Sequence, residues 1–279
     1  MKRHLFLSVA LIVLMAVWAP VVFAMSSDAE SATYQMKNSM QTNETLPFAL
    51  GVGASGDWVL DRTLDNGTDL EGGWYGANIF MDPVDRVHLD AFIGAANFNI
   101  GNVNVTGDSP STKTQLDTNT SIAVGGTAKV DVADFAVFPD QPNSWIFVSG
   151  GFRWANPDVD GATNLGRAAT LAMDVDVTEW QIGTGLSQRF NNLISGIGFV
   201  TYFGVQYSEI SVDINGTGTY PAIGIGPIQT IDTSQANSDD VIAAVLGCQI
   251  WGSEDKLMIG VEGRFIAETA VSVNGHFRW

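Results

Sequence analysis

The last nine residues of this 279-residue chain alternate between two kinds of side chain. Residues 271–279 read V-S-V-N-G-H-F-R-W, in which every second residue from Val271 onward is apolar or small and the residues between are polar. Because successive side chains of a β-strand point to opposite faces, this segment has one apolar face and one polar face. The segment is therefore predicted to be a strand with an apolar environment on one side and a polar one on the other.

The same alternation recurs along the chain from residue 46 to the C-terminus. It defines ten predicted strands, at residues 46–60, 73–82, 87–99, 120–132, 144–154, 176–188, 197–210, 240–251, 256–266 and 270–279. Each is close to the roughly 9–11 residues that a tilted strand needs to cross a bilayer. The pattern therefore predicts an all-β domain that is able to span a membrane with strands.

The connections between these segments differ in length in a regular way. Long connections, such as residues 155–175 and 211–239, alternate with short ones, such as residues 252–255. Long loops on one side and short turns on the other are typical of transmembrane β-barrels, in which an even number of strands places both termini on the side of the short turns. The last connection, near residues 267–269, belongs to the long-loop side and is nevertheless short.

The alternating C-terminal strand that ends on Trp279 resembles the terminal strand of bacterial outer-membrane β-barrels, which the barrel-assembly machinery reads. This resemblance implies a closed, antiparallel, up-and-down transmembrane β-barrel over residues 46–279, of about ten strands, with eight or twelve as alternatives. Closure has a physical reason, because an unpaired backbone amide in hydrocarbon costs several kcal/mol and an open sheet has two unpaired edges. The competing interpretation is a secreted β-sandwich.

The N-terminal 45 residues are predicted to lie outside the barrel. Residues 1–24 have a basic start, an apolar run and a small-x-small end at Ala24, which is the pattern of a secretory signal peptide. The alternative is an uncleaved membrane anchor. Residues 25–45 are polar and aperiodic and are predicted to be a disordered periplasmic lead-in. The expected location is the outer membrane of a Gram-negative bacterium after cleavage near Ala24, with the barrel as a monomer.

Net charge and cysteine content exclude several kinds of partner. The formal net charge is -17 at pH 7, and so acidic a chain repels nucleic acid. A single cysteine, Cys248, permits no internal disulfide and no cysteine-based metal cluster. Cys248 occupies an apolar position of a predicted strand and is interpreted as a small hydrophobic residue. No cofactor is predicted.

Most tryptophans of the predicted barrel fall near strand ends. Aromatic girdles are expected at both membrane interfaces, and this predicts a girdle made of Trp58, Trp74 and Trp154 at the outer ends and Trp145, Trp251 and Trp279 at the inner ends. Trp180 lies further into its strand and fits this pattern less well.

If the apolar faces contact lipid, the other faces line the interior. The predicted lumen-lining residues are Asp57, Asp90, Lys129, Asp131, Arg153, Glu179, Glu262, Arg264 and Arg278. Both signs of charge are present, so the interior is either a narrow wet pore or a plug of salt bridges. Asp90 and Lys129 lie on neighbouring strands and are predicted to pair. Small inward residues such as Gly51 and Gly185 are expected to leave space unfilled, and ten strands enclose only a small bore.

The predicted outer loops are strongly acidic. One interpretation of this composition is solvation of the loops, and the other is contact with lipopolysaccharide through bridging divalent cations. Residues 156–161, with Asp158 and Asp160, place oxygen ligands at alternate positions, which makes them a weak candidate for calcium binding; the later bidentate Glu of a calcium loop is missing.

Three functions are consistent with this pattern. The first is a porin-like barrel with a narrow pore for small solutes or ions, in which Lys129, Arg153, Glu262 and Arg264 line the pore. The second is a non-conducting structural or surface-binding barrel, adhesin-like, that acts through its acidic loops. The third is a rim hydrolase acting on protein or lipid, because proteases of the omptin class also resemble ten-stranded barrels.

A rim hydrolase has the weakest basis in the sequence. It would need a proton shuttle near pH 7, usually a histidine. His88 and His276 are both predicted at the periplasmic ends of their strands, far from the rim. The adjacent pair Asp239 and Asp240 lies at the rim, but successive strand residues point to opposite faces. No catalytic residue is assigned, and the chain is not expected to be an enzyme.

Overall fold

The computed structural model describes residues 49–279 with short gaps, at residues 85, 107–112, 136–143, 164–169, 195–196, 221–228, 232–234 and 253–255. The predicted signal peptide and lead-in, residues 1–45, lie outside the described residues. Within the described part of the chain, no helix is both long enough and apolar enough to span a bilayer.

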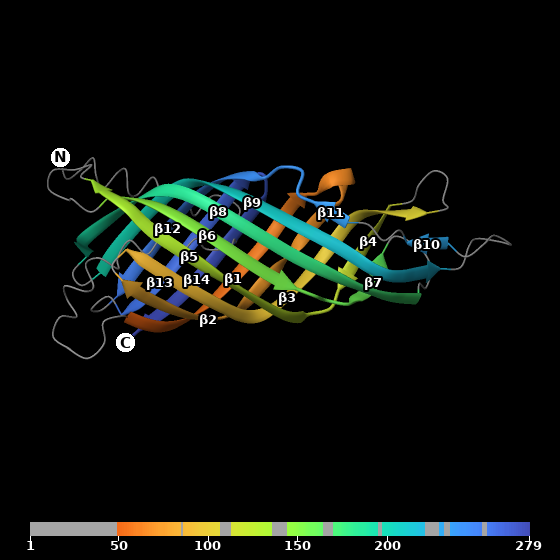
Figure 1. Ribbon diagram of the computed structural model, residues 1–279, viewed down its shortest axis with the longest axis horizontal. Helices are drawn as coiled ribbons and strands as arrows, with labels where there is room; N and C mark the ends of the chain where they lie inside the picture. The colour runs from red at the N-terminus through yellow and green to blue at the C-terminus, as the bar shows by residue number, and fades with distance from the viewer. Residues whose placement is uncertain are drawn as a thin grey trace.

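Ten antiparallel strands of the described residues form a closed ring (Figure 1). They are β1 (Ala49–Thr63), β2 (Asp69–Val84), β3 (Val87–Thr106), β5 (Ser121–Phe135), β6 (Ser144–Ala155), β8 (Thr170–Ile194), β9 (Ile197–Tyr220), β12 (Ile242–Gly252), β13 (Leu257–Ile266) and β14 (Thr269–Arg278). The ring closes because β1 pairs with β14, from Gly51 opposite Arg278 to Val59 opposite Ala270. The predicted ten-stranded up-and-down barrel is therefore confirmed, and each predicted strand overlaps one strand of the ring.

The outer and inner faces of the ring differ in polarity as the alternation predicts. On β12, the outward residues Ile242, Leu246 and Ile250 are exposed, whereas the inward Gln249 is fully buried. On β13, Glu262 and Arg264 point inward and are buried. All nine charged residues predicted to line the lumen are likewise buried in the structure. The barrel therefore has an apolar outside, suited to lipid, and a charged inside.

Additional short strands extend the barrel at the end opposite Ala49 and Trp279, the two termini of the described residues, and this end is here called the loop end. They are β4 (Lys113–Thr118), β7 (Val159–Thr163), β10 (Gln229–Ile231) and β11 (Gln235–Asn237), and a short 3-10 helix, η1 (Asp65–Gly67), lies beside them. β8 and β9 continue far past the ring at this end (Figure 1). The segments that were predicted to be long loops thus include short strands of the sheet.

These extra strands join the projecting ends of β3, β8 and β9 into a second, smaller ring. β4 pairs with β3 and β7, and β10 pairs with both β9 and β3. The bridge between Asp158 and Asp174 connects the start of β7 to β8, and the backbone N–H of Val175 donates to the carbonyl of Pro157 at 2.8 Å. We call this second ring the loop-end cap.

The cap encloses a cluster of apolar side chains. Its buried members include Leu64, Leu70, Phe98, Ile100, Leu116, Val175, Val177, Ile210 and Val212. These residues come from β2, β3, β4, β8 and β9 and from the residue that follows β1, so the cluster joins strands that are not neighbours in the ring. This part of the loop end is packed with apolar side chains, as in the core of a soluble domain.

Inside the ring, glycines lie opposite aromatic residues of the neighbouring strand. The pairs are Gly51 with Phe80, Gly185 with Phe147, and Gly247 with Tyr202. A Cβ atom added to any of these glycines would overlap the ring of its partner. The expectation that the small inward residues leave space unfilled is therefore wrong at these positions, because aromatic rings from the adjacent strand lie over them.

The structure corrects the predicted tryptophan girdle. Trp74, Trp145 and Trp251 point into the barrel and are only 1%, 2% and 2% exposed, so they are not in a lipid-facing girdle. Trp58, Trp154 and Trp279 are exposed on the outside, as the girdle requires. Trp180, which fitted the pattern less well, is exposed as well, and its ring packs 4.5 Å from that of Phe152. Alternation along the strands, not nearness to a strand end, determines which tryptophans face outward.

Candidate functional site: the barrel interior

A side chain from β1 reaches a side chain from the opposite wall of the barrel. The Arg62 Nη1 atom lies 3.2 Å from the Glu179 Oε1 atom. Arg62 belongs to β1 and Glu179 to β8, and four strands of the ring separate these two strands on either side. Both side chains are fully buried. This ion pair therefore spans the bore.

Further ion pairs extend this contact into a layer. Arg153 of β6 donates from Nε to Glu179 Oε2 at 2.7 Å and also pairs with Asp57 of β1. Arg264 of β13 lies 2.5 Å from Glu268 and 3.5 Å from Asp57. Arg62 closes the circuit by donating to Glu268 at 2.9 Å. We call these six residues, Asp57, Arg62, Arg153, Glu179, Arg264 and Glu268, the ionic layer.

The ionic layer is also held by uncharged groups. Arg62 donates to the Ser208 hydroxyl at 3.1 Å and, through Nη2, to the Ser208 carbonyl at 2.6 Å and the Ser238 hydroxyl at 2.8 Å. The guanidinium of Arg153 also lies over the Trp74 ring, 4.3 Å from its centroid. A buried ion pair keeps its favourable energy only when its remaining donors and acceptors are satisfied, and these contacts supply part of that. The layer is thus a connected plug rather than a set of isolated pairs.

Glu268 enters the layer from the tight turn between β13 and β14. This turn is the short connection that did not fit the expected loop pattern. Ile266, which precedes it, has a φ of 93°, a conformation that a β-branched residue rarely adopts. Two residues further on, Glu268 is 2% exposed and forms ion pairs with Arg62 and Arg264. The tight turn therefore places a carboxylate inside the barrel.

The strained turn leads to a stability prediction. Ile266→Gly is expected to raise the free energy of unfolding by about 1–2 kcal/mol, because glycine adopts positive φ without steric cost. Urea unfolding of the refolded barrel in lipid vesicles measures this change. The matched control is Ile259→Gly, at another outward isoleucine of β13 that has no positive φ, which should lower the stability instead. Equal losses in both variants would show that Ile266 is not strained.

A second polar cluster lies at the end of the barrel near the termini. Asp82 forms an ion pair with Arg278 at 2.8 Å and lies 2.8 Å from the His88 Nδ1 atom. The Phe80 ring stacks against His276, with ring centroids 4.8 Å apart. Both histidines are therefore buried at the terminal end and lie far from the loop end. This arrangement gives no support to the rim hydrolase.

The remaining predicted lumen residues also lie in this polar interior. Lys129 lies 3.2 Å from Asp131, the next inward residue of β5, and sits over the Phe147 ring. Asp90 accepts a hydrogen bond from Asn78 at 2.7 Å. Glu262 accepts one from the Tyr202 hydroxyl at 2.8 Å.

Two residues of the ionic layer, Arg62 and Glu268, were missed by the sequence analysis. Arg62 lies in β1 three residues short of η1, beyond the predicted end of that strand, and Glu268 lies in a predicted turn. Strand alternation continued from Asp57 would place Arg62, five residues on, on the outer face; the register shift between Val59 and Arg62 turns it inward, and the sequence pattern did not indicate that shift. Glu268 lies outside the alternating segments and offered no signal either.

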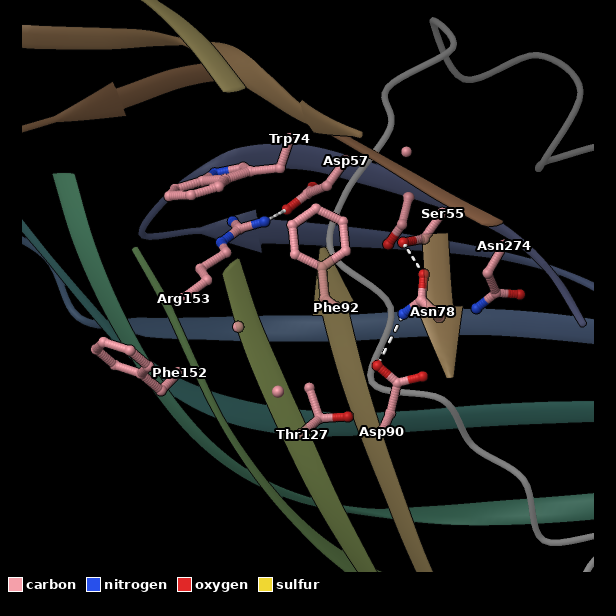
Figure 2. Close-up of a pocket in the computed structure, with 14 residues that line it drawn as sticks. Ser55, Asp57, Trp74, Asn78, Asp90, Phe92, Thr127, Phe152, Arg153 and Asn274 are labelled. Carbon is pink, nitrogen blue, oxygen red and sulfur yellow. Dashed lines mark hydrogen bonds and ion pairs between the residues drawn. The ribbon is translucent and has the colours of Figure 1, made fainter. Parts of the chain in front are cut away.

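A cavity of about 50 Å³ lies beside the ionic layer, and we call it the chamber (Figure 2). Its lining includes Ser55, Asp57, Trp74, Asn78, Asp90, Phe92, Thr127, Arg153, Ser272 and Asn274. Along one side, Ser55 donates to Asn78 and Asn78 donates to Asp90, each at 2.7 Å (Figure 2). On the other side of the chamber, Arg153 forms an ion pair with Asp57 beneath Trp74 (Figure 2). Most of the chamber lining is therefore apolar, with polar side chains at defined points along it.

The weak calcium candidate receives no geometric support. Asp158 and Asp160 are exposed at the loop end, and the Asp158 carboxylate lies 3.4 Å from the side-chain amide of Asn119. Across the described residues, no three histidine, cysteine or acidic side chains gather closely enough to hold a metal ion.

Comparison with known proteins places the chain in a broad class. No described protein family matches it. A major outer membrane porin of Chlamydia pneumoniae is 28% identical over 141 residues, which are 39% of this chain and 34% of that porin. The chain therefore matches about a third of the length of this curated relative.

Two solved structures of similar outline were also found. The translocator domain of the autotransporter NalP from Neisseria meningitidis is 11% identical, with 89% of this chain and 94% of that chain covered and a TM-score of 0.43. The transport unit of the autotransporter AIDA-I from Escherichia coli is 10% identical, with 89% and 96% covered and a TM-score of 0.39. The closed antiparallel ring with its apolar exterior and the porin relative together make this chain an outer-membrane β-barrel.

Proposed function

We propose that this protein is a sealed, non-conducting outer-membrane barrel that holds the loop-end cap at the cell surface for binding. The observation that carries this proposal is the pair Arg62–Glu179, which joins opposite walls of the ring through fully buried side chains. An ion in transit would have to displace this pair and its partners in the ionic layer. The apolar cluster of the cap adds a second barrier, because it offers no polar group to an ion.

The outer surface of the cap suggests what kind of partner it contacts. Asp176 of β8 lies directly opposite Asp213 of β9, and Asp174 lies two residues further along the same outward face. Like charges placed opposite each other destabilise a strand pair, so their presence points to a role outside folding. An acidic surface of this kind favours cationic partners, such as basic protein segments or divalent cations that bridge to lipopolysaccharide.

The second candidate is a porin-like pore that opens from this closed form. It is favoured by the similarity to the chlamydial porin and by the charged lining of the interior. The two functions differ in one expectation: a gated pore gives current steps at raised voltage, and a sealed barrel gives none. Neither function assigns a reaction to the protein.

Surface labelling tests whether the cap is displayed. In a Cys248→Ser background, Asp160→Cys in β7 should react on intact cells with a maleimide that does not cross membranes, because Asp160 is exposed on the cap. The matched control is Asp134→Cys, an exposed position at the other end of the barrel, which should react only after lysis. Labelling of Asp134→Cys but not Asp160→Cys on intact cells would reverse the orientation and contradict the proposal.

A further inference from the structure

Two buried polar groups that line the chamber lack a hydrogen-bond partner among the described residues. They are the indole N–H of Trp74 and the hydroxyl of Ser272. Each residue is only 1% exposed. A buried donor left without an acceptor costs about 1–3 kcal/mol, and nearly all buried donors in native proteins are paired. These two groups therefore call for an acceptor within the chamber.

The charges around the chamber limit what such an acceptor can be. The guanidinium of Arg153 forms ion pairs with both Asp57 and Glu179, so its positive charge is already balanced and does not attract an anion. The carboxylates of Asp57 and Asp90 would repel an anion as well. A cation would face the donor Trp74 N–H and the Arg153 guanidinium at the same end. An uncharged molecule meets neither obstacle.

The remaining lining groups fit an uncharged polar molecule. Ser55, Thr127 and Ser272 present hydroxyls and Asn274 presents an amide, so donors and acceptors are mixed around the space. Phe92 and Trp74 supply apolar ring surface for carbon atoms (Figure 2). The volume of about 50 Å³ is roughly a third of the 150 Å³ that holds a benzene molecule, which limits the occupant to about two or three non-hydrogen atoms.

We propose that the chamber is a binding site for a small uncharged solute that carries a hydroxyl or amide group, of the size of a one-carbon alcohol or amide. The solute accepts a hydrogen bond from the Trp74 indole and exchanges one with the Ser272 hydroxyl, and its carbon atom packs on Phe92. This site lies beside the ionic layer, and its occupancy does not depend on whether the barrel conducts.

Titration of the refolded protein with methanol or formamide, followed by the indole N–H resonances of its tryptophans, tests the proposal. The Trp74 resonance, identified by its loss in Trp74→Phe, is expected to shift and to saturate at concentrations on the order of millimolar, since few atoms make the contact. Trp251 serves as an internal control. Its indole N–H is also buried without a hydrogen-bond partner among the described residues, but Trp251 does not line the chamber. Its resonance should not show saturation.

Two serine variants complete the test. Ser272→Ala is expected to weaken the affinity by about three- to ten-fold, the loss of one hydrogen bond. Ser187→Ala removes a buried hydroxyl that also has no partner among the described residues but lies outside the chamber, and it should leave the affinity unchanged. The proposal would be overturned if the Trp74 and Trp251 resonances both shifted linearly with solute concentration, without saturation. Equal affinities in the two serine variants would overturn it as well. If Trp74→Phe fails to refold, the comparison of the serine variants decides alone.

Discussion

Glu179→Gln is expected to lower the free energy of unfolding by about 3–5 kcal/mol, the loss expected when one partner of a buried ion pair is removed. Glu179 is bonded to Arg62 and Arg153, and both guanidinium groups stay buried when its charge is gone. Glutamine keeps the size of the side chain, so the loss reports charge and hydrogen bonding rather than a cavity. Urea titration of the protein refolded in vesicles, followed by tryptophan fluorescence, measures this effect.

The control for this prediction is an ion pair on the surface. Asp134 lies 2.7 Å from Arg86, and its side chain is 58% exposed. Asp134→Asn makes the same chemical change as Glu179→Gln, but exposed pairs contribute only about 0–1 kcal/mol. Similar losses in the two variants would mean that the ionic layer is hydrated, and the bore would then be open to water.

Leu246→Arg is expected to destabilise the barrel in a bilayer by about 2–4 kcal/mol, because an arginine near the membrane midplane loses its hydration. Leu246 lies at the middle of β12 and points outward, with 57% of its surface exposed. The same denaturant titration in vesicles gives the difference from the unmodified protein. A destabilisation of this size requires that the exposed face of β12 contact lipid rather than water.

Ile242→Arg provides a control that differs from Leu246→Arg only in its depth within the bilayer. Ile242 is on the same face of the same strand and is 60% exposed, but it is the first residue of β12 at the loop end. Near the interface the cost of an arginine falls to about 0–1 kcal/mol. If both substitutions were harmless in vesicles, the outer face of the ring would lie in water, and the membrane assignment would be wrong.

The ring itself could be predicted from the sequence because each of its strands carries one apolar and one polar face. On β5, Val130 and Val132 point outward and are exposed, whereas Lys129 and Asp131 point inward and are buried, and this alternation is visible in the sequence. Strand pairing then follows from chain order, since each strand pairs with the next one in the ring and the last pairs with the first. Side-chain periodicity and short turns together determine this part of the fold.

The loop-end cap was not predicted, although part of its signal is present in the sequence. Met173 and Val175 continue the inward alternation of β8 beyond the predicted strand, and Val212 and Ile214 do so on β9. These inward positions are apolar, whereas the inward positions nearer the middle of the barrel are polar. The predicted strands are those that alternate between an apolar outer face and a polar inner face. Segments in which the inner face is also apolar do not show this alternation, so the projecting ends of β8 and β9 were assigned to loops.

The tryptophan assignments show which of two sequence rules is stronger. Trp74 has the same parity along β2 as Asn78, and Trp145 has the same parity along β6 as Arg153. Alternation therefore placed both tryptophans inside, while their position near strand ends placed them in a girdle. The structure follows alternation, because a strand cannot turn one side chain to the opposite face without a bulge.

The ionic layer illustrates what sequence analysis of a barrel leaves undetermined. Alternation identified Asp57, Arg153, Glu179 and Arg264 as inward, and the structure brings these four together. Which of them touch depends on the stagger between strands that are not neighbours, and strand alternation carries no information about that stagger. The contact between Arg62 and Glu179 across the bore could therefore be found only in three dimensions.

The most direct test of the sealed barrel is the current through a planar lipid bilayer that contains the refolded, unmodified protein. The contacts across the bore and the apolar cluster of the cap predict no current steps in potassium chloride at any voltage the bilayer tolerates, with insertion verified separately by protease protection in vesicles. Discrete, reproducible steps from the inserted protein would contradict this account and would favour the porin-like pore.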